Sequence, residues 1–154
     1  AFGLSEALNI SRTEASKIIS DYFRKFEGVR VYIDETIKFA HENGFVKTIL
    51  GRKRVINELS AKNPALKKFG ERAAINAPIQ GSASDIVKLA MIKLDTQIKS
   101  KMILQVHDEL IFESDEATLK SELPLIQKTM ENIITLKVPL KVNSKIALNW
   151  DEAH

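Results

Sequence analysis

The sequence contains no cysteine among its 154 residues, which excludes disulfides and thiolate metal sites. It has no apolar run near the roughly 20 residues that a membrane-spanning helix needs. The residues after Ala1 lack the basic and apolar stretches of a signal peptide. We therefore expect a cytoplasmic domain with no membrane partner. The hydrophobic fraction of 44% and charged fraction of 28% are typical of a globular protein with one core.

Lysine and arginine are concentrated in the middle of the chain. Residues 47–72 contain eight basic and two acidic residues, a net charge of +6, whereas residues 105–154 contain five and nine, a net charge of −4. Such a distribution is typical of a polyanion held beside a carboxylate site that binds cations. Two solvated faces would give the same pattern, and charge alone favours that interpretation.

The first part of the chain is predicted to be mostly helical. Ser11 and Glu14 form a capping box, and apolar and aromatic residues follow at helical spacing, which predicts an inward face. Gly28 and Gly44 stand where helices of this length end. The sequence predicts helices over 11–26 and 29–42, then short strands over 45–50 and 54–56.

The predicted turn between these strands is basic. Gly51 begins the turn, and Arg52, Lys53 and Arg54 follow directly. At a hairpin tip these side chains would reach an external partner, and we interpret them as contacts to a nucleic-acid backbone.

Proline residues punctuate the second part of the chain. Asn63-Pro64 is a typical helix start, and Ala77-Pro78 is expected to break or kink the helix that follows. Pro124 is expected to disturb a later helix. The predicted elements are a helix from 64, a helix over 81–98, strands over 102–106 and 110–112, a helix over 116–134 and a strand over 140–148. The balance is α+β, helix-rich with a small antiparallel sheet.

His107, Asp108 and Glu109 separate two of the predicted strands and therefore form a hairpin turn. Adjacent carboxylates on a rigid hairpin are ligands that Mg²⁺ prefers. Acidic residues are also common in exposed turns that bind nothing. Taken alone, the three residues favour a plain structural turn over a metal site.

The string from Gln105 to Glu113, QVHDELIFE, resembles the C motif of family A (bacterial DNA polymerase I-like) DNA polymerases. The string from Glu71 to Ile86 resembles that family's helix with DNA-contacting Arg, Asn and Gln. Residues 48–54 resemble its basic hairpin, and residues 149–154 resemble the C-terminus of bacterial members.

The resemblance implies roles for the turn. Asp108 is similar to an aspartate that binds catalytic metal, and Glu109 to a supporting carboxylate beside it. Polymerases use two Mg²⁺ ions, about 3.5–4 Å apart, for nucleotidyl transfer. The resemblance also places His107 at the DNA primer terminus and gives Gln105 a role in supporting the turn. His107 itself is a poor Mg²⁺ ligand because that ion prefers oxygen.

The same resemblance implies DNA contacts by Arg72, Asn76 and Gln80, which are four residues apart and so share a helix face. The minor groove offers acceptors that depend little on sequence, which suits amide donors, whereas Arg suits phosphate. Without the resemblance, such a polar row would simply indicate an exposed face.

Residues 1–154 are expected to form one polymerase fragment, fingers-like over about 1–75 and palm-like over about 76–154. Nothing in them matches the family's first metal-binding aspartate or its nucleotide-gripping helix. We expect a parent protein that extends a DNA primer on a template from dNTP, and a fragment that is inactive alone and self-associates. The alternative is a non-catalytic DNA-binding module.

Overall fold

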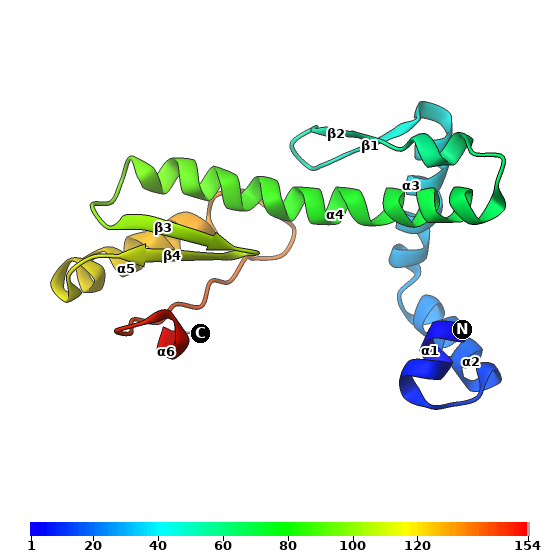
Figure 1. Cartoon of the computed structure of the whole chain (residues 1–154), viewed down its shortest axis with the longest axis horizontal. Coiled ribbons are helices and arrows are strands. Elements are labelled where there is room, and N and C mark those ends of the chain that lie inside the picture. Colours follow the sequence, from blue (N-terminus) through cyan, green and yellow to red (C-terminus); the bar gives the residue numbers. More distant parts are fainter. Residues whose placement is uncertain (154) are drawn as a thin grey trace. The chain divides into compact units, whose positions relative to one another are not determined.

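The computed structural model describes residues 1–153, which divide into two compact units. Unit 1 comprises Ala1–Lys47 and Gly51–Pro78, and unit 2 comprises Thr48–Leu50 and Ile79 onward. The helices are α1 (Phe2–Leu8), α2 (Arg12–Lys25), α3 (Glu27–Asn43), the 3₁₀ helix η1 (Asn57–Ser60), α4 (Pro64–Asp95), α5 (Glu116–Glu131) and α6 (Trp150–Ala153) (Figure 1). The strands are β1 (Phe45–Lys47), β2 (Lys53–Val55), β3 (Lys101–Val106) and β4 (Glu109–Glu113). His154, the last residue of the C-terminal string, lies outside the described residues.

The predicted fold class is confirmed. Helices dominate the described chain, and the strands form two separate antiparallel pairs, β1–β2 and β3–β4. The short α1 was not predicted, because seven residues give too little periodicity to recognise. No helix among residues 1–153 is both long and apolar enough to cross a membrane.

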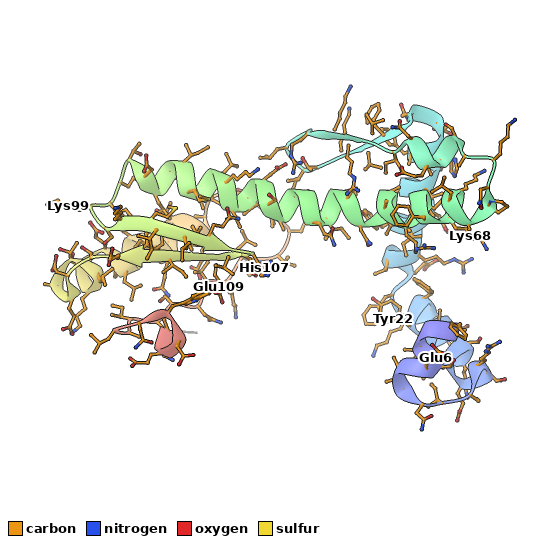
Figure 2. The ribbon with its side chains drawn as sticks, viewed as in Figure 1. Glu6, Tyr22, Lys68, Lys99, His107 and Glu109 are labelled. Carbon is orange, nitrogen blue, oxygen red and sulfur yellow. The ribbon has the colours of Figure 1, made fainter. Side chains whose placement is uncertain are left out.

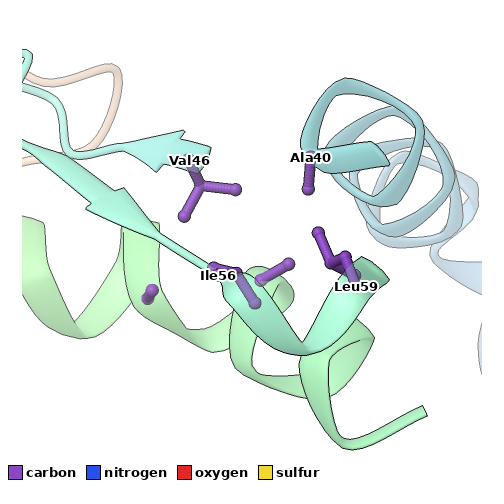
Figure 3. Packing of buried hydrophobic residues seen from close by; sticks show 6 residues of the cluster. Ala40, Val46, Ile56 and Leu59 are labelled. Carbon is purple, nitrogen blue, oxygen red and sulfur yellow. The ribbon is translucent and has the colours of Figure 1, made fainter. Parts of the chain in front are cut away.

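Small and branched residues form the core of unit 1. The buried cluster joins α3, the β1–β2 hairpin, η1 and the first part of α4 (Figure 3), and consists of Ala40, Val46, Ile56, Leu59, Ala74 and Ala77. The Tyr32 hydroxyl of α3 donates to the Ile75 carbonyl of α4 at 3.0 Å. Gly70 of α4 allows close packing, because a Cβ there would lie 3.0–3.2 Å from Glu58 and Leu59. The hairpin and η1 are thus fixed against α4.

Helix α2 begins as predicted, but its aromatic residues are not buried as predicted. The Ser11 side chain accepts from Glu14 N, and Glu14 accepts from Ser11 N, a complete capping box. Tyr22 and Phe26, expected to pack inward, are 47% and 46% exposed. They contact each other with centroids 5.0 Å apart. Ile18 is also 46% exposed, and Ala15 is the one buried residue of α2, so the inward face predicted from helical spacing is mostly wrong within unit 1.

Helix α3 begins earlier than predicted. Phe26 is both the C-cap of α2 and the N-cap of α3, so Gly28 lies inside α3 and does not end the preceding helix. Gly44 does end α3, in the left-handed conformation at φ 75°. The two helices are therefore joined without a glycine turn.

The β1–β2 hairpin is shorter than predicted. Its strands pair Phe45 with Val55, Val46 with Arg54 and Lys47 with Lys53. The connecting loop runs over residues 48–52, and Gly51 takes φ 84° there. Lys53 therefore lies in a strand and not in the predicted turn, whereas Arg54 lies in a strand as predicted.

Helix α4 is one continuous helix of 32 residues, so the predicted break at Ala77-Pro78 is wrong (Figure 1). Asn63 caps it as predicted, accepting from Ala65 N at 2.9 Å. Pro78 lacks the N–H that would bond the Ala74 carbonyl, and an interior proline costs roughly 3 kcal/mol. Buried residues on both sides, such as Ala77 and Leu94, provide packing that outweighs this cost.

In unit 2 the β3–β4 hairpin pairs Lys101 with Glu113 and Val106 with Glu109, with a register irregularity between Met102 and Leu104. Helix α5 runs through Pro124 without interruption and ends at Glu131. The expected disturbance is therefore wrong. Asp115 caps α5, accepting from Thr118 N at 2.9 Å.

The strand predicted over 140–148 is also wrong. These residues form neither helix nor strand in the structure. A strand requires a neighbour for its backbone groups, and Val142 uses its own differently. Its N–H donates to Glu131 Oε1 at 3.0 Å and its carbonyl accepts from Gln127 Nε2 at 3.4 Å. Hydrogen bonds to side chains of α5 thus take the place of the hydrogen bonds of a β-ladder.

Candidate functional site

The tip of the β3–β4 hairpin presents acidic and imidazole side chains to solvent. His107 and Asp108 form a two-residue turn, and Glu109 is the first residue of β4, so the three-residue turn predicted from the sequence is one residue too long. His107, Asp108 and Glu109 are all exposed. Figure 2 shows His107 and Glu109 at this end of the hairpin.

The turn is conformationally demanding. His107 has φ 54°, a left-handed conformation that costs a non-glycine residue of order 1 kcal/mol or more. Gln105 Nε2 donates to the His107 carbonyl at 3.1 Å and thereby braces the turn. Short turns with rigid flanking strands hold the intervening side chains in one place. The hairpin thus fixes the position of the Asp108 backbone.

The donor chemistry of this tip fits a hard cation. Asp108 and Glu109 supply carboxylate oxygens, which Mg²⁺ prefers. Among residues 1–153 no group of three or more His, Asp or Glu side chains is placed to hold a metal ion. Two carboxylates form a partial donor set, which suits Mg²⁺ because that ion retains waters and substrate phosphates as its remaining ligands.

The polar row predicted for a nucleic-acid contact lies on α4. Arg72, Asn76 and Gln80 are all exposed. Arg72 and Asn76 are one turn apart in unit 1, and the Arg72 guanidinium carbon lies 5.9 Å from the Phe69 ring centroid. Gln80 follows on the part of α4 that belongs to unit 2.

The basic hairpin does not present its predicted cations together. Lys53 and Arg54 are adjacent in β2, and adjacent strand residues point to opposite faces. Arg54 therefore shares the face of its partner Val46, whereas Lys53 shares the face of Lys47. Arg52 lies in the preceding loop. Strand alternation thus places Lys47 on the same face as Lys53, although the two residues lie apart in the sequence.

A carboxylate of α5 fixes the beginning of β3. Glu122 accepts hydrogen bonds from Lys99 N at 2.7 Å, from Ser100 N at 3.1 Å and from Ser100 Oγ at 2.6 Å. These bonds favour the ionised form, so the Ser100 hydroxyl first and then the Lys99 N–H lower the pKa of Glu122. Nothing in the sequence marked Glu122, because its partners lie 22 and 23 residues away.

Residues 1–152 match the family model described as DNA polymerase family A. Similar proteins include DNA polymerase I of Rhizobium leguminosarum, 44% identical over all of this chain and 16% of its own length. DNA polymerase I of Caldicellulosiruptor bescii is 46% identical over 98% of this chain and 18% of its own length. The chain belongs to DNA polymerase family A.

A solved structure supports the same assignment. The POL domain of Pol1 from M. smegmatis, in complex with DNA primer-template and dNTP, is 42% identical with a TM-score of 0.85. The match covers 91% of this chain and 26% of that one. Among the relatives above, the chain spans less than a fifth of the length of each DNA polymerase I.

Proposed function

We propose that this chain is part of a DNA-directed DNA polymerase that extends a primer on a template from dNTP. The observation with most weight is the fixed hairpin tip with Asp108 exposed beside Glu109, in a chain that matches family A over residues 1–152. The similarity to a domain solved with primer-template and dNTP supports these substrates.

Asp108 and Glu109 would hold Mg²⁺, with Asp108 as the main ligand. The bound ion would supply charge stabilisation at the reacting phosphate and primer hydroxyl. The contribution of the chain itself is positional. Gln105 and the β3–β4 ladder hold Asp108 in place, and exposed His107 is available to contact the primer terminus.

Residues of α4 and of the basic hairpin would contact the template-primer. Arg72 suits phosphate, while the amides of Asn76 and Gln80 suit the minor groove, whose acceptors vary little with sequence. Such contacts let an enzyme accept every template. Arg52, Lys53 and Arg54 would contact the nucleic-acid backbone. The salt slope is the decrease of the logarithm of the binding constant per unit increase in the logarithm of the salt concentration, and each phosphate contacted would add about 0.9 to it for duplex binding.

A protein consisting only of residues 1–154 would have little or no activity. Polymerisation depends on positioning and on charge stabilisation by two metal ions, and the carboxylates in this chain are a partial donor set. Its exposed apolar side chains would favour self-association, since unit 1 alone exposes Tyr22, Phe26 and Phe69 by 46–51%. We place the parent protein in the cytoplasm.

The competing candidate is a non-catalytic DNA-binding module, favoured by the same basic stretch and by the incomplete donor set. Primer extension by the full-length protein, with Mg²⁺ and all four dNTPs, distinguishes the two. The polymerase proposal expects template-dependent extension. Tight primer-template binding without any extension would establish the module.

A further inference from the structure

The β1–β2 hairpin places two lysines opposite each other. Lys47 and Lys53 are Cα partners in the last ladder pair before the loop. Side chains opposite one another have Cβ atoms about 4.5–5.5 Å apart, where like charges destabilise the ladder. Residues 45–55 contain no aspartate or glutamate to offset this repulsion. Within residues 1–153 neither lysine forms an ion pair.

One aromatic ring holds both ammonium groups on the same face of the hairpin. Lys53 Nζ lies 4.5 Å from the Phe45 ring centroid, and Lys47 Nζ lies 5.6 Å from it. The ring of Phe39 in α3 packs edge-on against Phe45, with centroids 5.7 Å apart and planes at 85°. Attraction between each cation and the ring keeps the two charges together despite their repulsion.

Building on the proposed function, we infer that Lys47 and Lys53 form a two-cation site for a phosphate of the nucleic-acid backbone. Each ammonium has three donors and acts as a compact point charge, and a phosphodiester offers two charged oxygens. Binding the anion offsets the repulsion between the two ammonium groups, which destabilises the free hairpin. The site lies within the stretch 47–72, whose net charge of +6 suits a polyanion.

This site differs from the basic triplet recognised in the sequence. Arg54 shares the opposite face of the hairpin with Val46, so it cannot join Lys53 on the Phe45 ring. Lys47, six residues before Lys53, is the second cation of the site. Lys47 contributes to the net charge of residues 47–72 but lies outside the triplet Arg52, Lys53 and Arg54.

Charge reversal at Lys47 tests the site, because it should affect stability and binding in opposite directions. In the full-length protein, Lys47→Glu creates an ion pair across the ladder with Lys53. Amide hydrogen exchange in residues 45–55 of the free protein should slow by about two- to fivefold. The Kd for primer-template should rise about tenfold at low salt, and the salt slope should fall by about 0.9.

The matched controls separate this site from general electrostatics. Lys145→Glu makes the same charge change at an exposed residue outside every helix and strand, and should leave both readouts unchanged. Lys47→Arg keeps the charge and should keep the affinity within about twofold. Equal primer-template affinity in the two Glu variants would overturn the site.

Phosphate could also come from the incoming nucleotide. A raised KM for dNTP with an unchanged Kd for primer-template in Lys47→Glu would overturn the assignment to the nucleic-acid backbone. If the wild-type protein binds and extends primer-template, and Lys47→Glu changes neither hydrogen exchange nor the Kd for primer-template, this inference alone is refuted. A wild-type protein that extends no primer would refute the proposed function itself.

Discussion

The two units differ in charge and in how they present their functional side chains. Unit 1 has fourteen basic and nine acidic residues, a net charge of +5, whereas unit 2 has nine and eleven, a net charge of −2. The candidate metal ligands lie in unit 2, and most of the candidate phosphate contacts lie in unit 1. With the proposed roles, turnover should depend mainly on unit 2, and the salt-dependent part of nucleic-acid affinity mainly on unit 1.

The largest expected effect is on turnover alone. Asp108→Ala in the full-length protein removes the main proposed metal ligand, so kcat should fall by about 10³-fold or more. The Kd for primer-template should change by less than about twofold, because Asp108 is an anion and is not one of the proposed phosphate contacts. Single-turnover extension and equilibrium binding measure the two quantities. An equal loss of both would show that Asp108 is structural.

A change in unit 1 should have the converse effect. Arg72→Ala should raise the Kd for primer-template about tenfold and lower the salt slope by about 0.9, since one phosphate contact is lost. Gln80→Ala is the comparison, because an uncharged donor contributes affinity without counterion release. Binding measured from 50 to 200 mM salt distinguishes them. An unchanged slope in Arg72→Ala would remove Arg72 from the phosphate contacts.

The packing of unit 1 should be sensitive at Gly70. Gly70→Ala places a Cβ 3.0 Å from Glu58 Cβ and 3.1 Å from Leu59 N, so η1 must move away from α4. We expect a loss of roughly 1–3 kcal/mol in the free energy of unfolding. Gly28→Ala is the control, because a Cβ there meets nothing within 4 Å and the residue lies in α3. Gly28→Ala should be neutral or stabilising by up to about 1 kcal/mol. Chemical denaturation followed by hydrogen exchange in η1 compares the variants; equal stability would contradict the packing.

The smallest expected effect concerns Glu122 in unit 2. Its pKa is lowered in the folded state, so its contribution to stability is present above the unfolded value of about 4.3 and is lost as pH falls through the folded pKa. Glu122→Gln should lower the melting temperature at pH 7, and the difference should shrink as pH falls below the unfolded pKa and through the lowered folded pKa of Glu122. Melting curves between pH 3 and 8 measure this. A difference that persists at low pH would mean that charge is not responsible.

Local signals predicted the fold well where they were strong. The capping box of Ser11 and Glu14, the Asn63-Pro64 helix start and the strands predicted over 102–106 and 110–112 all correspond to elements in the structure. Each depends on interactions within a few residues. The family resemblance predicted by the motif strings is confirmed over residues 1–152.

The predictions from the sequence were wrong where contacts between residues far apart in the chain determine the structure. Pro78 alone predicts a break, but residues buried on both sides of it hold α4 together. Residues 140–148 have strand-like alternation, yet Val142 bonds side chains of α5. For the site, the residue types of the hairpin tip were evident, whereas the Lys47–Lys53 pair required the ladder register.

The binding of Mn²⁺ to the β3–β4 tip tests the account most directly. The full-length protein would be bound to a primer-template with a dideoxy end and the matching dNTP, then titrated with Mn²⁺ and followed by electron paramagnetic resonance. Asp108→Asn should weaken at least one Mn²⁺ site by about tenfold or more, with Lys145→Glu unchanged. Identical Mn²⁺ affinity and stoichiometry in wild type and Asp108→Asn would contradict the claim that this hairpin holds a catalytic metal ion.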